Sequence, residues 1–279
     1  MARATRSTHP VQALREVTTS LEASILLCLA KPGKKAVHEL RTFTRRIEAQ
    51  FELLSMLPEL PPHDEQQRKA LRLLKKLRHA AGQVRDIDVQ RNLIRDEAAS
   101  HKAASRTNSE IRKEASHLRR DLNRKRDKEA DRLLRLLRKH RTTLPDVFQE
   151  LLDALAPAES ITVSEAKLTA LVRGWYKDHR DRHTPDAVPH DAAELHLLRK
   201  RAKLARYLAE SAPKSATAAH RLAAQFEKLQ QTGGKWHDLL ILAEVAASDL
   251  GNSAKLPQRF AAKADRALAT FKRRLRYKM

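Results

Sequence analysis

Two motifs occur in the same order in both halves of the chain. The first half contains Val37-His38-Glu39-Leu40-Arg41 and, later, Gly82-Gln83-Val84-Arg85-Asp86. The second half contains Leu195-His196-Leu197-Leu198-Arg199 and, later, Gly234-Lys235-Trp236-His237-Asp238. The histidines are 196 − 38 = 158 residues apart and the first glycines of the second motifs 234 − 82 = 152 apart. The sequence therefore predicts two copies of one structural unit, with a shorter internal connection in the second copy.

Apolar residues recur at helical spacing almost throughout the chain. One clear series is Leu40, Phe43, Ile47, Phe51 and Leu54, and no long stretch alternates with period two. Each copy, about 10–141 and about 146–279, has room for about four helices, and four amphipathic helices can bury all their apolar faces in a bundle. The prediction is an all-α fold made of two copies of a four-helix unit.

Glycines suggest where some of these helices end. Helix breaks are predicted at Gly82 and at Gly233-Gly234, because glycine weakens a helix interior and often follows a helix end. Three aspartates follow these glycines, namely Asp86, Asp88 and Asp238. They are interpreted as capping residues that open the next helix.

The charge of the chain predicts the class of its partner. Fifty-six Lys and Arg residues against 34 Asp and Glu residues give a net charge of +22. Such an excess repels itself, and a polyanion would relieve that repulsion. A nucleic acid is the alternative partner, since any basic surface gains from neutralising phosphates. However, aromatic residues make up only 4% of the chain, which leaves few platforms on which bases can stack.

The two histidine motifs each predict a one-sided row of donors. In the first helix, His38, Arg41 and Arg45 lie on the side opposite the apolar face. The second helix has His196, Arg199, Lys203 and Arg206 in its row, with Tyr207 beside them. Successive turns of a helix are about 5.4 Å apart, so each row can engage successive phosphates of an extended chain. A structural role for the histidines is the alternative.

Further basic residues extend this prediction to other segments. Residues 64–81 and 111–141 each display a basic face, for which a merely solubilising role is the alternative. The candidate phosphate-binding residues are His38, Arg41, Arg45, Arg46, Arg72, Lys75, Lys76, His79, Arg85, His117, Arg120, Arg124, His196, Arg199, Lys203, Arg206, Tyr207 and His237.

The residue pattern offers no catalytic centre. Metal binding is not predicted, because Cys28 is the one cysteine and no His/carboxylate set is found at ligand spacing. A phosphohydrolase would need carboxylates arranged around Mg²⁺, whereas the acidic residues are scattered among basic ones. We therefore expect no enzymatic activity, no catalytic residue and no cofactor.

The cellular location is predicted from the single cysteine and from the lack of a long apolar segment. A single cysteine cannot form an intramolecular disulfide, which indicates a reducing compartment, and Cys28 is expected in the core. The longest early apolar run, Ile25 to Ala30, is too short for a membrane span or for a signal-peptide core. The protein is expected to be cytoplasmic and not to associate with membranes.

With its two ordered pairs of motifs, the chain resembles the CHAD family of histidine-containing α-helical domains over essentially its whole length. The resemblance implies a single domain, residues 1–279, of two pseudo-symmetric four-helix bundles. It also implies non-catalytic binding of inorganic polyphosphate in a basic groove lined by helices of both repeats, often at polyphosphate granules. Relatives can be joined to a separate catalytic domain, so an accessory role in phosphoanhydride processing is an alternative.

The chain departs from the family pattern at two positions. Glu48 stands where the first motif commonly has a basic residue, and Leu240 where the second commonly has Asp. Glu48 is expected to remove one phosphate contact.

Overall fold

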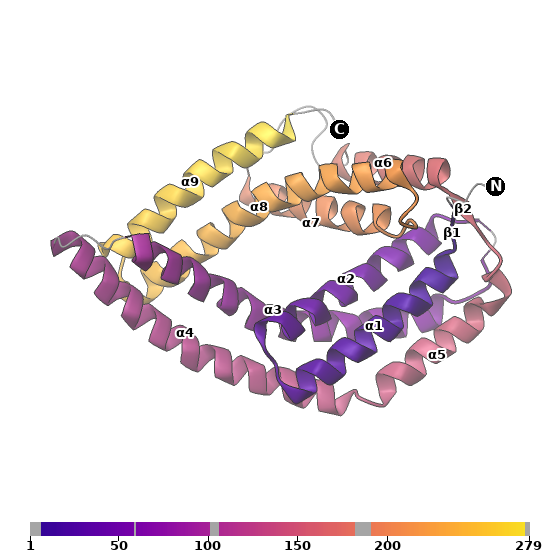
Figure 1. Ribbon diagram of the computed structural model, residues 1–279, viewed down its shortest axis with the longest axis horizontal. Helices are drawn as coiled ribbons and strands as arrows, with labels where there is room; N and C mark the ends of the chain where they lie inside the picture. Colours follow the sequence, from indigo (N-terminus) through magenta and orange to yellow (C-terminus); the bar gives the residue numbers. More distant parts are fainter. Residues whose placement is uncertain (1–6, 59, 101–105, 182–190, 277–279) are drawn as a thin grey trace. The chain divides into compact units, whose positions relative to one another are not determined.

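The computed structural model describes residues 7–58, 60–100, 106–181 and 191–276. Almost all of these residues are helical, which confirms the predicted all-α fold (Figure 1). The helices are α1 (Pro10–Ala30), α2 (Lys34–Ser55), α3 (Asp64–Ser100), α4 (Arg106–Lys139), α5 (Thr143–Leu155), α6 (Glu165–Asp181), α7 (Ala192–Ala209), α8 (Thr217–Leu250) and α9 (Lys255–Leu275). A short 3-10 helix, η1 (Ala156–Ala158), follows α5, and two-residue strands β1 (Ser7–Thr8) and β2 (Val163–Ser164) pair antiparallel.

The chain forms two compact units, each assembled from segments that are distant in sequence. Unit one comprises Met1–Ala81 and Leu133–Gln230, and unit two comprises Gly82–Arg132 and Gln231–Met279. The boundaries fall within α3, α4 and α8, so these three helices contribute to both units. Each unit thus combines a part of the first half of the chain with a part of the second. The repeats at about 10–141 and 146–279 divide the chain in a different way and stay a prediction.

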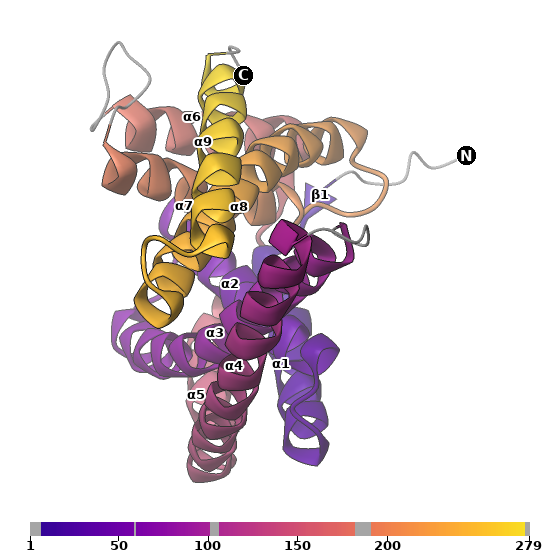
Figure 2. The ribbon, with the colours of Figure 1, turned by 90° about the vertical axis from the view of Figure 1, so that its left-hand side faces the viewer.

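Unit one is built around α2. This helix packs against α1 and α7, while α6 packs on α7 and α5 on α1. Figures 1 and 2 both show α1 and α2 side by side. Most of the predicted apolar face of α2 is fully enclosed, including Leu40, Ile47 and Leu54. Cys28 of α1 is buried as expected, and burial raises the pKa of its thiol to about 12.

Unit two contains the C-terminal parts of α3 and α8, most of α4, and α9. Helix α9 turns back along α8, and the rings of Trp236 and Phe271 stack with centroids 5.9 Å apart. Ile94 of α3 and Leu118 of α4 are also buried. Each unit therefore has its own apolar core.

The predicted helix breaks at Gly82 and at Gly233-Gly234 are wrong. Both positions lie inside long continuous helices, α3 and α8. The apolar spacing continues across the first of them, through Leu77, Val84 and Ile87, all of which are buried. A glycine in a helix interior costs about 1 kcal/mol, and burying several large side chains outweighs that cost because each contributes about 1.5–3 kcal/mol.

Candidate functional site

The candidate phosphate-binding residues divide between the two units. Unit one holds His38, Arg41, Arg45, Arg46, Arg72, Lys75, Lys76, His79, His196, Arg199, Lys203, Arg206 and Tyr207. Unit two holds Arg85, His117, Arg120, Arg124 and His237. The two rows predicted from the repeated histidine motif therefore lie in the same unit.

The packing of α2 against α7 places these two rows on neighbouring helices. His38 is exposed near the start of α2, and His196 is half-exposed near the start of α7. One turn after His196, the Nη2 atom of Arg199 lies 3.4 Å from the imidazole Nδ1. Phosphate contacts by these residues stay a prediction, but their arrangement permits one anion to reach both helices.

Glu48 links the first row to α3. Its Oε2 atom accepts hydrogen bonds from Nη1 of Arg45 at 2.7 Å and from Nη1 of Arg78 at 3.0 Å. Both arginine side chains are only about a fifth exposed, at 21% and 18%. Arg45 is more buried than its position opposite the apolar face predicts, because α7 as well as α1 packs against α2. Glu48 thus holds two guanidinium groups in place, beyond the expected loss of one contact.

Sequence reasoning missed Arg78, although a signal was present. Arg78 lies four residues after Leu74, on the side of α3 that carries the buried leucines. A charged residue at an apolar position needs a partner, and Glu48 supplies it. Burial, and then the positive charge of Arg45, lower the pKa of the Arg78 guanidinium in spite of Glu48.

Lys200 is a second missed residue of this cluster. Its pKa is lowered from the ordinary lysine value, first by loss of hydration and then by the positive charges of Arg45, Arg199 and Arg78. Lys200 therefore belongs to a group of cations contributed by α2, α3 and α7. We call Arg45, Arg78, Arg199 and Lys200 the cation cluster. Perturbed side chains of this kind are often found at functional sites.

Tyr207 is placed beneath the second row. Its side chain is buried, and burial raises the pKa of the phenol. Three cations lie over its ring, Arg46 at 5.9 Å, Lys203 at 5.9 Å and Arg206 at 5.7 Å from the centroid. The ring can hold these charges in position through cation–π attraction.

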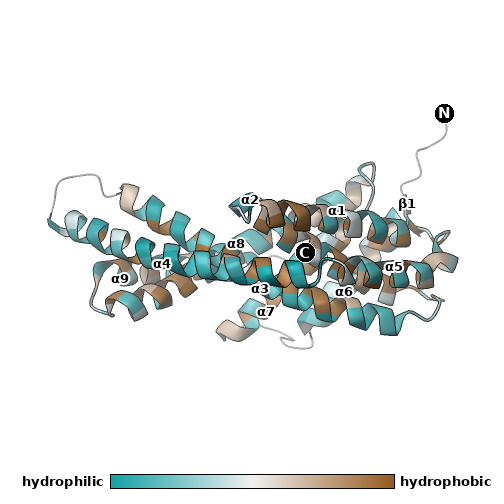
Figure 3. Ribbon diagram, turned by 90° about the horizontal axis from the view of Figure 1, so that it is seen from below, coloured by the Kyte–Doolittle hydropathy of each residue, from teal (hydrophilic) through white to brown (hydrophobic). Residues whose placement is uncertain are grey.

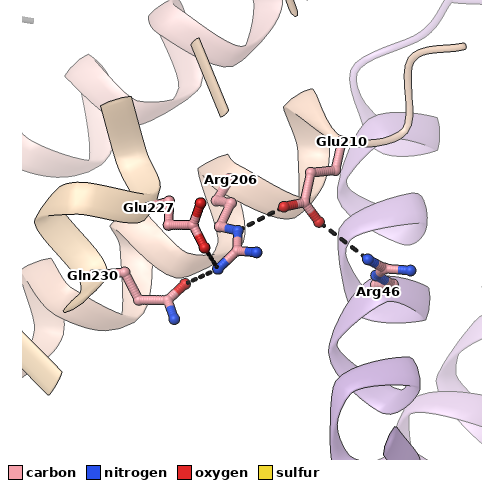
Figure 4. Close-up of polar contacts among 5 residues, drawn as sticks. All are labelled: Arg46, Arg206, Glu210, Glu227 and Gln230. Atoms are coloured by element: carbon pink, nitrogen blue, oxygen red, sulfur yellow. Dashed lines mark hydrogen bonds and ion pairs between the residues drawn. The ribbon is translucent and has the colours of Figure 1, made fainter. Parts of the chain in front are cut away.

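Glu210 bridges the two helices beside Tyr207. Figure 4 shows its carboxylate between Arg206 of α7 and Arg46 of α2, with contacts of 2.6 and 3.3 Å. Arg206 also contacts Glu227 at 3.0 Å and Gln230 at 3.4 Å, both on α8. The two carboxylates, Glu210 and Glu227, partly neutralise the row, which the pattern of basic residues did not predict.

The candidates on the first part of α3 are all exposed: Arg72, Lys75, Lys76 and His79. Lys76 is near the end of α4, where burial and the charges of Lys76 and Lys139 lower the pKa of His140. These four side chains form an accessible part of the basic surface of unit one.

In unit two, the interpretation of three aspartates as caps is wrong, because they lie within helices. Arg85 of α3 bonds to Asp86 at 3.0 Å and to Asp238 of α8 at 3.3 Å. Asp88 is buried and bonds to Arg126 of α4 through Oδ1 at 2.8 Å. The carboxylates therefore join helices through arginine. His237, next to Asp238, is half-exposed.

Helix α4 carries mostly hydrophilic residues (Figure 3). Arg120 and Arg124 are exposed, and Arg124 pairs with Asp121. His117 Nε2 lies 3.5 Å from Oδ2 of Asp121 and 3.7 Å from Oδ2 of Asp249. The expectation that no histidine and carboxylates meet at ligand spacing is therefore wrong.

Family membership follows from the sequence match. Residues 12–247 match the family model of the CHAD domain. The chain belongs to the CHAD family. None of the curated proteins is significantly similar in sequence to this CHAD protein.

Two solved structures share its fold. PptA from Streptomyces chartreusis has a TM-score of 0.66 at 16% identity, over 97% of this chain and 99% of PptA. The CHAD domain from the plant Ricinus communis has a TM-score of 0.65 at 16% identity, over 100% of this chain and 96% of the plant domain. Within the described parts of this CHAD protein, no helix combines the length and apolar character needed to cross a bilayer.

Proposed function

We propose that this CHAD protein binds inorganic polyphosphate without catalysis, principally through the rows on α2 and α7. The observation that carries the proposal is the cation cluster. Arg45, Arg78, Arg199 and Lys200 are close enough for three of the charges to depress the pKa of the fourth. Glu48 bonds to two of these cations, Arg45 and Arg78. The excess positive charge favours an anion at this place.

The surrounding contacts prepare the basic side chains for binding. Glu48, Glu210 and the ring of Tyr207 restrain guanidinium and ammonium groups that are otherwise flexible. Restraining such side chains before binding lowers the entropy that binding must overcome. A linear anion with a charge on every unit can then engage several restrained donors in succession.

The placement of aromatic side chains supports polyphosphate over a nucleic acid. Bases of single strands bind by stacking on exposed rings. In the described part of the chain, the tyrosine and tryptophan side chains are all buried, namely Trp175, Tyr176, Tyr207 and Trp236. Phe43 of α2 is half-exposed, and the other phenylalanines are buried, so few rings are open to a base. An anion without bases loses nothing by the absence of such platforms. We also propose a cytoplasmic location at polyphosphate granules, which rests on the single cysteine and on the resemblance to the CHAD family.

A competition titration tests the proposal. A labelled long-chain polyphosphate is titrated with the full chain, and unlabelled polyphosphate or duplex DNA competes at equal phosphate concentration and physiological salt. We expect polyphosphate to compete better, with an affinity that falls steeply as salt rises. Equal or better competition by DNA would favour the nucleic-acid alternative.

Charge variants locate the binding. Lys200→Ala should weaken binding, whereas Lys167→Ala, which removes an exposed lysine of α6 in the same unit, should have little effect. If both variants bind like the unchanged protein, the cation cluster is not the site.

A further inference from the structure

His117, Asp121 and Asp249 lie on two helices of unit two, and each offers one atom that can bind a metal ion. His117 and Asp121 are one turn apart on α4, and Asp249 is the next-to-last residue of α8. The imidazole Nε2 and one oxygen from each carboxylate all lie within 4.8 Å of one another. Among the described residues, this is the group in which histidine and carboxylate side chains converge in this way.

The spacing of these atoms suits a small divalent ion. Four ligands held tetrahedrally at about 2.1 Å from an ion are about 3.4 Å apart. His117 Nε2 is 3.5 Å from Asp121 Oδ2 and 3.7 Å from Asp249 Oδ2. The two carboxylate oxygens lie within 4.8 Å of each other, so rotation of the side chains is needed to bring all three atoms to bonding distance of one ion. The side chains are 51%, 30% and 29% exposed, so an ion can reach them from solvent.

The neighbouring groups leave the ligand atoms available. Arg124 pairs with Oδ1 of Asp121, while Oδ2 of the same carboxylate faces His117. Asp249 stands in the last turn of α8, where the partial negative charge of the helix C-terminus favours a cation. Two carboxylates and this helix end therefore favour a cation here, although Arg124 offsets one of the negative charges.

We propose that His117, Asp121 and Asp249 form a binding site for zinc. One imidazole nitrogen with two carboxylate oxygens is a ligand set that zinc accepts, whereas Ca²⁺ and Mg²⁺ favour oxygen ligands alone. Three protein ligands leave a fourth tetrahedral position for water or for an oxygen of an anion. The site joins α4 to the end of α8 and does not depend on polyphosphate binding.

Calorimetric titration of the metal-free full chain with ZnCl₂, in a buffer that does not coordinate metals, tests this site. We expect a zinc-binding step that weakens at least tenfold in His117→Ala and in Asp249→Asn. Asp127→Asn removes an exposed carboxylate from the same helix and should bind zinc like the unchanged chain. Calcium at equal concentration should not displace zinc.

A spectroscopic measurement on the unchanged chain complements the variants. Co²⁺ bound at the site should show the visible absorption of a four-coordinate ion, and Asp249→Asn should lose it. The proposal is overturned if Asp249→Asn binds zinc as tightly as Asp127→Asn, or if bound Co²⁺ has the weak spectrum of an octahedral aqua ion. Melting curves of the metal-free variants verify that they are folded.

Discussion

Glu48 accepts a hydrogen bond from Arg78, with 3.0 Å between Oε2 and Nη1. Under the predicted repeat, with its offsets of 158 and 152 residues, these positions correspond to Arg206 and Gln230. These side chains also bond, with 3.4 Å between Nη1 of Arg206 and Oε1 of Gln230. In both halves the histidine-bearing helix therefore contacts the following helix at the same place. In the first half the histidine-bearing helix contributes a carboxylate, that of Glu48. In the second half it contributes a guanidinium, that of Arg206.

Replacing Glu48 with Gln should strengthen polyphosphate binding. The amide oxygen of glutamine can still accept a hydrogen bond from Arg45 or Arg78, so part of the restraint is kept. The negative charge is lost, and a unit charge about 6 Å from a phosphate is worth about 0.7 kcal/mol in water. Affinity should rise about threefold at low salt, while the free energy of unfolding falls by about 0.5–1 kcal/mol as the ion pairs are lost. Glu39→Gln removes the same charge near the start of α2 and should change affinity less. Weaker binding by Glu48→Gln would contradict this prediction.

Removing cations from either helix should weaken binding of the same anion. Arg41→Ala with Arg45→Ala on α2, and Arg199→Ala with Lys203→Ala on α7, should each reduce affinity several-fold. Each lost phosphate contact should also reduce the salt dependence, by about 1 in the slope of log K against log salt. Polyphosphate titrations at several salt concentrations measure both effects. If one pair abolishes binding and the other leaves it intact, a single helix forms the site.

Lys200→Gln should have opposite effects on binding and on stability. The folded-state pKa of Lys200 lies below its ordinary value of 10.5, so between these two values the unfolded chain binds more protons. Charged Lys200 therefore costs stability below the folded-state pKa, and this cost disappears as pH rises toward 10.5. The variant should melt slightly higher at pH 7, bind polyphosphate less tightly, and lose its stability advantage near pH 10.5. Calorimetry across this pH range would contradict the prediction if the advantage grew with pH.

Gly234→Ala should stabilise the protein. Gly234 lies inside α8, and nothing is within 4 Å of the place that a Cβ atom would occupy. Alanine there should raise the free energy of unfolding by about 0.5–1 kcal/mol. Gly251 is a matched control, since its φ of +86° after α8 disfavours a side chain. Gly251→Ala should lower the melting temperature, and a lower value for Gly234→Ala would contradict the continuous helix.

The sequence alone predicted the helical fold and the buried face of α2. Helical periodicity is local, so the series from Leu40 to Leu54 identified a buried face correctly. The recurrence of His38 at His196 indicated related helices, and these helices do pack together in unit one. Local patterns are informative here because each helix presents its apolar face to whichever neighbour covers it.

Only the tertiary structure decided which charges meet. Glu48 of α2 bonds to Arg78 of α3, and the charges of Arg45 and Arg78 lower the pKa of Lys200 on α7. Asp249 of α8 lies beside His117 of α4. Each of these contacts joins different helices. Such contacts depend on the rotation and crossing of packed helices, which one-dimensional spacing does not specify. The same reason explains the error at Gly82, where a local cost of about 1 kcal/mol favoured a break. Burial of the long apolar face of α3 against its neighbours exceeds that cost, and neighbours are a property of the folded chain.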